Sequence, residues 1–106
     1  MENLSDGNFD KFIEGAEKPI LVDFFANWCP PCSILGPILE ELESDFKERV
    51  IFSRINVDLA SKIGQKFGIV NIPTVILFKD GNPVGRFIGL HSEEEIRNWL
   101  KGLLNQ

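Results

Sequence analysis

The chain has 106 residues, of which 43% are hydrophobic and 25% charged, and it contains two cysteines. This length and composition favour one soluble globular domain over residues 1–106, and two cysteines are too few for a disulfide scaffold. The formal net charge of −5 argues against nucleic acid or an anionic membrane as a partner, and no apolar run reaches the ~20 residues that a membrane span needs.

The first half of the chain predicts a helix, a strand and a second helix. Polar residues 5–8 offer N-caps for a short helix over residues 9–13, and no basic and apolar leader precedes them, so we expect no signal peptide. Residues 20–26 are apolar on both alternating faces, which is typical of a central strand covered on both sides. Apolar residues at helical spacing predict a helix over residues 33–47.

The second half predicts three more strands and two helices. Residues 50–57 form a strand, and Asp58 is the expected cap of a short helix that Gly68 ends. Residues 74–78 and 84–88 flank turn-forming residues and predict a hairpin, whose second strand begins near a proline and therefore lies at an edge.

The last helix opens with a capping box. Ser92 and Glu95 have the required spacing, and apolar residues at helical spacing follow them. Strands joined through helices are parallel neighbours, whereas a hairpin pairs its strands antiparallel. We therefore expect an α/β fold with a mixed sheet.

Both cysteines lie in the motif Trp-Cys-Pro-Pro-Cys at residues 28–32, where a strand meets a helix. Unpaired N–H groups and the helix dipole favour an anion there, so the Cys29 thiol tends towards the nucleophilic thiolate. Two intervening residues let Cys29 and Cys32 close a small disulfide ring and exchange it with a partner. The pair alone also fits a structural disulfide or half of a zinc site, although zinc needs two more ligands and His91 is the only histidine.

Taken with its surroundings, this motif resembles the thioredoxin family over nearly the whole chain. A lone Cys-x-x-Cys is a weak signal, but the upstream aspartate, the tryptophan and a later Ile-Pro-Thr make it specific. The matching positions are Val22-Asp23-Phe24-Phe25-Ala26, Trp28-Cys29-Pro30-Pro31-Cys32, Pro37, Asn56-Val57-Asp58, Gly68-Ile69, Ile72-Pro73-Thr74, Phe78-Lys79-Asp80-Gly81 and Gly89. The resemblance implies the thioredoxin fold, a central mixed β-sheet flanked by helices on both faces.

The resemblance also implies a thiol–disulfide oxidoreductase that reduces protein disulfides by dithiol–disulfide exchange. Cys29 would be the exposed attacking thiolate and Cys32 the buried resolving thiol. No bound cofactor and no metal are implied, because the Cys29–Cys32 disulfide is itself the redox group. The expected partners are disulfide-containing client proteins and a thioredoxin reductase, NADPH- or ferredoxin-linked, as electron donor. The implied setting is a monomer in the cytoplasm.

A docking surface for clients is implied around Cys29. The Ile72–Pro73 bond would be cis and face the cysteines, so that the Ile72 backbone can pair with an extended client segment. Without the family pattern, Pro73 would be an ordinary proline at the start of a strand. The residues implied in docking are Trp28, Pro30, Pro31, Val70, Asn71, Ile72, Pro73 and Gly89.

Asp23 interrupts an otherwise apolar strand. It shares a face with Leu21 and Phe25, so we expect a buried carboxyl group whose pKa is raised by desolvation and which exchanges a proton with Cys32. The alternative is a solvent-facing residue on a half-exposed strand. Arg54, on the neighbouring predicted strand, is expected to reach towards Asp23 and tune its pKa.

The chain departs from the commonest family pattern at four positions near the motif. Pro30 replaces a glycine, Phe25 a tryptophan, Ser33 a lysine and Arg54 a lysine, and the first strand, before residue 5, is short or missing. The dithiol chemistry is untouched, but the reduction potential and the preferred partner depend on such positions. Two alternatives therefore stay open: a specialised oxidase or isomerase, and a non-catalytic binding module of a larger complex.

Overall fold

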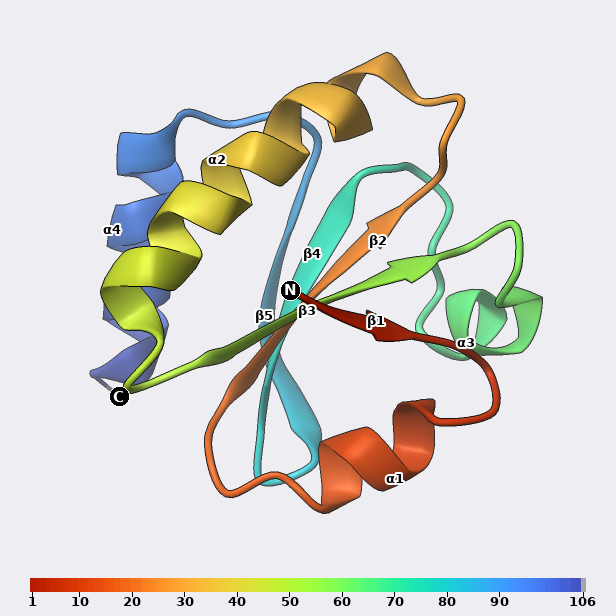
Figure 1. Cartoon of the computed structure of the whole chain (residues 1–106), viewed down its shortest axis with the longest axis horizontal. Coiled ribbons are helices and arrows are strands. Elements are labelled where there is room, and N and C mark those ends of the chain that lie inside the picture. Colours follow the sequence, from red (N-terminus) through yellow and green to blue (C-terminus); the bar gives the residue numbers. More distant parts are fainter. Residues whose placement is uncertain (106) are drawn as a thin grey trace.

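In the computed structural model, which describes residues 1–105, five strands form one sheet in the order β1-β3-β2-β4-β5 (Figure 1). The strands are β1 (Glu2–Leu4), β2 (Ile20–Phe25), β3 (Ile51–Asn56), β4 (Thr74–Lys79) and β5 (Asn82–Ile88). The helices are α1 (Phe9–Glu14), α2 (Pro30–Phe46), α3 (Ser61–Lys66) and α4 (Glu93–Leu104).

The sheet is mixed, as the connections predict. Strand β2 lies between β3, to which it is parallel, and β4, to which it is antiparallel. Strand β1 is present but short, and it pairs in parallel with β3. Strand β5 closes the hairpin with β4 and lies at the edge of the sheet, where Pro83 can be accommodated without a missing ladder hydrogen bond.

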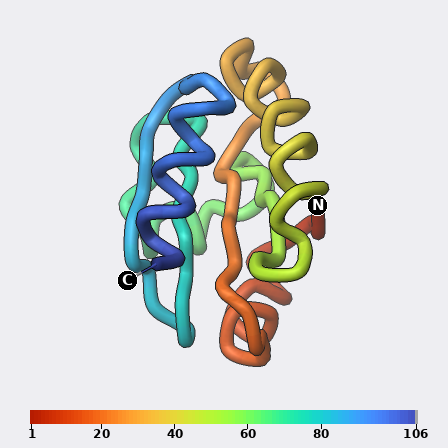
Figure 2. The backbone as a smooth tube through the Cα atoms, turned by 90° about the vertical axis from the view of Figure 1, so that its left-hand side faces the viewer, coloured from red at the N-terminus to blue at the C-terminus, as the bar shows by residue number. Residues whose placement is uncertain are grey.

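Helices cover the sheet on both faces. Alternate residues of β2, represented by Val22, pack with α1 and α3, while Leu21 packs with α2 and α4. Figure 2 shows α2 and α4 side by side on the face towards the viewer. Because side chains alternate along a strand, Asp23 points to the same side of the sheet as Leu21, beneath α2.

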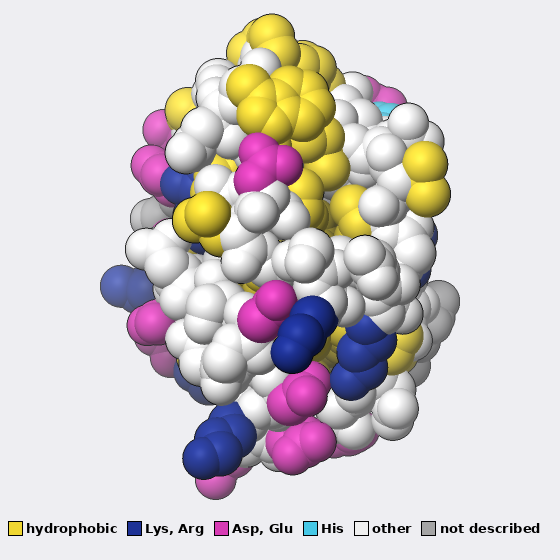
Figure 3. Space-filling view, turned by 90° about the vertical axis from the view of Figure 1, so that its right-hand side faces the viewer, with side chains coloured by type: hydrophobic (Ala, Val, Ile, Leu, Met, Phe, Trp, Pro, Cys, Tyr) yellow, Lys and Arg dark blue, Asp and Glu magenta, His cyan; other side chains and the backbone are white. Residues whose placement is uncertain are grey.

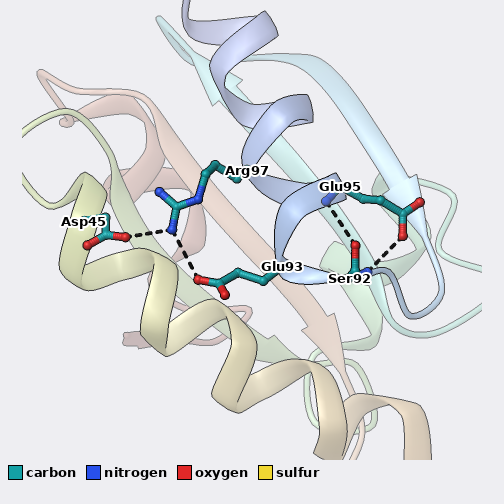
Figure 4. A network of polar contacts seen from close by, with 5 residues as sticks. All are labelled: Asp45, Ser92, Glu93, Glu95 and Arg97. Atoms are coloured by element: carbon teal, nitrogen blue, oxygen red, sulfur yellow. Dashed lines mark hydrogen bonds and ion pairs between the residues drawn. The ribbon is translucent and has the colours of Figure 1, made fainter.

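Helix α4 is fixed at its start and on its outer face (Figure 4). The Glu95 amide donates to Ser92 Oγ and the Ser92 amide donates to Glu95 Oε1, both at 3.1 Å, which confirms the capping box. The Arg97 guanidinium donates to Asp45 of α2 at 2.7 Å and to Glu93 at 3.2 Å. Both ion pairs are exposed and contribute little to stability, but the pair between Arg97 and Asp45 joins α4 to α2 over one face of the sheet.

The prediction that Asp58 caps the short helix α3 is wrong. This helix begins at Ser61, and the amides of Lys62 and Ile63 donate to the carboxylate of Asp6, at 3.3 and 3.0 Å. Asp58 instead accepts a hydrogen bond from the Trp28 indole. The other end is as expected, because Gly68 follows with a φ of 64°, a left-handed conformation that glycine adopts readily.

Candidate redox-active site

Cys29 and Cys32 lie where β2 meets α2, and they form a disulfide. Cys29 is the N-cap residue of α2, and its Sγ accepts a hydrogen bond from the Cys32 amide at 3.3 Å. The first-turn amides of a helix lack backbone partners, and the positive end of its dipole lies there. In the dithiol form this position favours Cys29 as the thiolate.

Helix α2 begins earlier than the periodicity predicts, at Pro30 rather than Ser33. Prolines suit the first turn because their missing N–H groups have no helical partner there. Pro30 and Pro31 therefore offer no N–H to Cys29, and the Cys32 amide is the remaining first-turn donor. An N-cap side chain accepts from the second or third residue of the helix. Pro31 thus occupies the position where a second donor would reach the sulfur.

We expect Pro31→Ala to lower the pKa of Cys29 in the reduced protein. The substitution supplies an N–H at the second helical position, and a hydrogen bond to a charged group is worth about one pH unit of pKa. The ultraviolet absorbance of the thiolate, followed through a pH titration, measures the change. Pro30→Ala is the matched control, because an N–H at the first helical position is not aimed at the cap. Equal shifts in both variants would contradict the donor argument.

The expectation of an exposed Cys29 is wrong for this disulfide form. Cys29 is 3% and Cys32 4% exposed. Both pack in a small cluster with Ala26, against which Phe25, Val57 and Ile72 lie. Position, rather than exposure, separates the two sulfurs: Cys29 caps the helix, while Cys32 lies inside its first turn.

The Ile72–Pro73 segment lies directly against the disulfide. Its peptide bond is cis, as the family resemblance implies, and the Ile72 carbonyl oxygen lies 3.8 Å from Cys29 Sγ. The segment is held by two hydrogen bonds, from Gly89 N to Pro73 O at 2.8 Å and from Thr74 Oγ1 to Asn71 O at 2.6 Å. Within residues 1–105 no hydrogen bond engages the Ile72 N–H.

The structure places most of the expected docking residues on one surface around the disulfide. Trp28 is 69% and Val70 87% exposed. Figure 3 views the molecule from the right-hand side of Figure 1 and shows hydrophobic side chains gathered in the upper half of that side. Pro73 departs from the expectation, because its side chain is buried and only its backbone borders the surface. Of the remaining residues, the exposed ones are Pro30, Pro31 and Asn71, and the half-buried ones are Ile72 and Gly89.

Asp23 is fully buried on β2, which ends just before the cysteines. Neither of its carboxylate oxygens has a hydrogen-bond partner among residues 1–105. Burial raises the pKa of Asp23 from 3.8 to about 7, and the positive charge of Arg54 partly opposes this rise. The expected buried carboxyl group is confirmed, and its two oxygens are free to accept a proton near neutral pH.

Arg54 acts on Asp23 from a distance. The two residues are register partners on β3 and β2, but Arg54 stacks on Phe25, with its guanidinium carbon 3.8 Å from the ring centre. Its Nε is buried and, within the described chain, lacks a partner. Arg54 therefore lowers the pKa of Asp23 through its charge, as expected. It does not reach the carboxylate, because the guanidinium stacks on the Phe25 ring.

We expect Arg54→Met to raise the pKa of Asp23 further. Methionine keeps an unbranched side chain over Phe25 but removes the charge that favours the carboxylate. The Asp23 carboxyl resonance, followed by NMR through a pH titration, measures the shift. Arg86→Met is the matched control, since Arg86 is exposed and donates to Phe67 O. Identical titrations in the parent and in Arg54→Met would remove the role given to Arg54.

Comparison with known proteins agrees with this geometry. The family model described as Thioredoxin matches residues 1–102. The chain belongs to the thioredoxin family. It is 43% identical over 101 residues to the thioredoxin of Alicyclobacillus acidocaldarius, covering 95% of each chain. It is 47% identical over 97 residues to the thioredoxin of Chlamydia pneumoniae, covering 92% of each.

This thioredoxin-family protein is a thiol–disulfide oxidoreductase, and Cys29–Cys32 is its redox-active disulfide. The binding-module and specialised-oxidase alternatives are not favoured by these relatives. A bifunctional thioredoxin reductase/thioredoxin of Mycobacterium leprae is also similar, at 38% identity over 86 residues. The match covers 81% of this chain but only 19% of that longer protein.

One residue of the site was not assigned correctly from the sequence. The Asp58 carboxylate accepts a hydrogen bond from Trp28 Nε1 at 2.7 Å, and the Asp58 amide donates to Asn56 Oδ1 at 2.9 Å. Asp58 therefore holds the indole next to the redox pair of this family member. The block from Asn56 to Asp58 was part of the resemblance, but no local pattern indicates which distant side chain the carboxylate binds.

The zinc alternative finds no support in the described chain. Among residues 1–105, no group of three or more His, Cys, Asp or Glu side chains is placed to hold a metal ion. His91 lies 3.1 Å from the Ile88 carbonyl oxygen and 3.6 Å from a Glu95 carboxylate oxygen. Nor does any helix in this part of the chain have the length and apolar character to cross a membrane.

Proposed function

We propose that the protein reduces the disulfides of client proteins, with Cys29 as the attacking thiolate and Cys32 as the resolving thiol. The observation that carries this proposal is the position of Cys29 at the N-cap of α2, with the Cys32 amide 3.3 Å from its sulfur. That amide and the helix dipole stabilise a thiolate at Cys29 rather than at Cys32. We further propose that residues 1–106 act as one domain and as a monomer in the cytoplasm.

The exchange proceeds in two displacements. The Cys29 thiolate attacks one sulfur of the client disulfide, that bond breaks, and the other client sulfur leaves as a thiolate that takes up a proton. Cys32 then loses its proton and attacks Cys29 in the mixed disulfide, which releases the second client thiolate. Two electrons pass to the client, and the protein is left with its Cys29–Cys32 disulfide.

Asp23 accepts the Cys32 proton during the second displacement. A general base works best when its pKa lies near the operating pH, and the pKa of Asp23 is raised to about 7. In this disulfide form no hydrogen bond within residues 1–105 reaches the Asp23 oxygens, so they are free to take the proton of the Cys32 thiol, directly or through a water molecule. The same group returns a proton when the disulfide is reduced again.

The client lies in an extended conformation against the Ile72 backbone. Its main chain pairs with the Ile72 N–H and carbonyl, as an added strand pairs with a sheet edge. The Ile72 oxygen lies 3.8 Å from Cys29 Sγ, so this pairing sets the client cystine beside the attacking sulfur. Trp28 and Val70 contact the flanking client side chains.

A thioredoxin reductase reduces the Cys29–Cys32 disulfide back to the dithiol. The support is the bifunctional thioredoxin reductase/thioredoxin of Mycobacterium leprae, whose name joins the two activities in one chain. Reduction with NADPH and its flavoprotein reductase, compared with reduction through ferredoxin, distinguishes the two kinds of donor.

The test of the proposed function is the reduction of a cystine-containing peptide with dithiothreitol as the recharging reductant. We expect catalytic release of peptide thiols. A Cys29→Ser/Cys32→Ser double variant should release none. If the parent protein also releases none, and both proteins bind the peptide equally, the protein is a binding module and the proposed function fails.

A further inference from the structure

The exposed hydrophobic side chains of this protein gather at one end of the sheet. Six of the larger ones lie in segments at the redox end, and Val84 lies near the other end of β5. An exposed apolar patch on a soluble protein usually marks an interaction site. The six residues are Trp28, Ile34, Leu59, Val70, Ile88 and Leu90.

Leu59 is one of four members of this group that no step so far uses, and it is the one that directly follows Asp58 in the chain. It is 82% exposed, yet it lies on a well-held turn between β3 and α3, where its amide donates to Asn56 O at 3.1 Å. The preceding residue, Asp58, binds the Trp28 indole at 2.7 Å, and Val57 packs against the cysteine cluster. The Leu59 backbone is therefore held next to Asp58, the residue that binds the Trp28 indole, at the rim of the redox site.

Apart from Asp58, whose carboxylate binds the Trp28 indole, the segments at this end of the molecule carry little charge. Residues 27–34, 69–74 and 87–90 contain no Asp, Glu, Lys or Arg, although a quarter of the chain is charged. In Figure 3 the basic side chains lie mainly in the lower half of the face, and an acidic side chain lies beside the hydrophobic ones in the upper half. A client segment that crosses this end would leave its own acidic side chains without cationic partners, whereas its apolar side chains would be removed from water.

We propose that Leu59 and Trp28 form a subsite for an apolar side chain of the client, next in sequence to the cysteine that Cys29 attacks. The inference rests on the proposed function, because only a client bound for exchange sets its chain across Cys29. Leu59 thereby becomes a specificity residue of the reaction. Cystines flanked by leucine, isoleucine or phenylalanine are the preferred substrates, and cystines flanked by acidic residues are poor ones.

Two cystine peptides that differ only beside the reactive cysteine, one with leucine and one with glutamate, test the subsite. With dithiothreitol recharging, kcat/KM in the parent should be about tenfold higher for the leucine peptide, as partial burial of one leucine side chain predicts. Leu59→Ser should bring the two values close to equality, while Leu59→Met should keep the preference. Val84→Ser is the matched control, since it removes an exposed apolar side chain away from the site and should also keep the preference.

The subsite would be overturned, with the exchange function left intact, by equal kcat/KM for both peptides in the parent or by a leucine preference that survives Leu59→Ser. A parent protein that reduces neither peptide would instead overturn the exchange function on which the subsite rests. Loss of the preference in Val84→Ser as well as in Leu59→Ser would show a general effect of surface hydrophobicity and would also refute the subsite.

Discussion

Cys32→Ser will hold client proteins as stable mixed disulfides through Cys29, whereas Cys29→Ser will abolish client reduction. The first variant keeps the thiolate at the N-cap of α2 and the residue-32 amide that donates to this sulfur in the parent, but it lacks the thiol that resolves the intermediate. The second variant lacks the nucleophile altogether. We expect the loss of turnover to reach the uncatalysed background in both proteins.

Non-reducing electrophoresis and mass spectrometry of the variants, mixed with a cystine peptide, measure the trapped species. The adduct should map to Cys29 and disappear on addition of dithiothreitol. The Cys29→Ser protein is the matched control, because it retains a single thiol at Cys32. An adduct that forms faster in Cys29→Ser than in Cys32→Ser, or faster alkylation of Cys32 in the reduced parent, would reverse the assignment of the two thiols.

Asp23→Asn will make the disulfide form more stable at neutral pH and slow the resolving step. In the native protein the Asp23 carboxyl group, whose pKa is about 7, keeps its proton after the unfolded chain, at 3.8, has released its own. Stability therefore falls as the pH rises from about 4 to about 7, by about 1.4 kcal/mol for each pH unit between the two pKa values. Because asparagine does not ionise, the variant lacks this loss of stability with rising pH.

The free energy of unfolding is expected to rise by about 2–4 kcal/mol at pH 7. This gain is smaller than the whole pH-dependent loss in the parent, because the buried asparagine amide also lacks hydrogen-bond partners. Urea unfolding of the oxidised parent and of Asp23→Asn, at several pH values between 4 and 8, measures it. The stability of Asp23→Asn relative to the parent should rise as the pH rises through this interval. Parallel curves over this interval would show that Asp23 titrates normally and would end its role as a buried base.

The rate of the resolving step tests the role of Asp23 as a base independently of stability. Rapid mixing of the reduced protein with a cystine peptide separates formation of the mixed disulfide from release of the second thiol. We expect Asp23→Asn to slow release by about 10²-fold, the contribution typical of a positioned general base, and to leave formation nearly unchanged. Equal slowing of both phases would point to a structural effect on the site instead.

Much of this fold can be predicted from local sequence, because each element depends on neighbouring residues. The apolar run before the cysteines specifies a central strand, and Ser92 with Glu95 specifies the start of α4 through contacts three residues apart. The burial of Asp23 follows from the same reasoning, since the two-residue period of a strand places it on the face of Leu21. The redox pair is likewise local, because Cys29 and Cys32 lie within one helical turn.

The tertiary structure decided the contacts that join segments far apart in the chain. The start of α3 is capped by Asp6, and Asp58, the residue with the better local position, binds Trp28 instead. Arg54 stacks on Phe25 rather than pairing with Asp23.

By itself, then, the sequence determined the order of the elements, the chemistry of the dithiol and the face on which Asp23 is buried. Tertiary contacts decided that Cys29 is covered in the disulfide form and that Asp58 binds the Trp28 indole. The physical reason is the same in both cases. Propensity, periodicity and capping act over a few residues, whereas the partner of a long polar side chain and the exposure of a sulfur depend on which distant segments the sheet brings together.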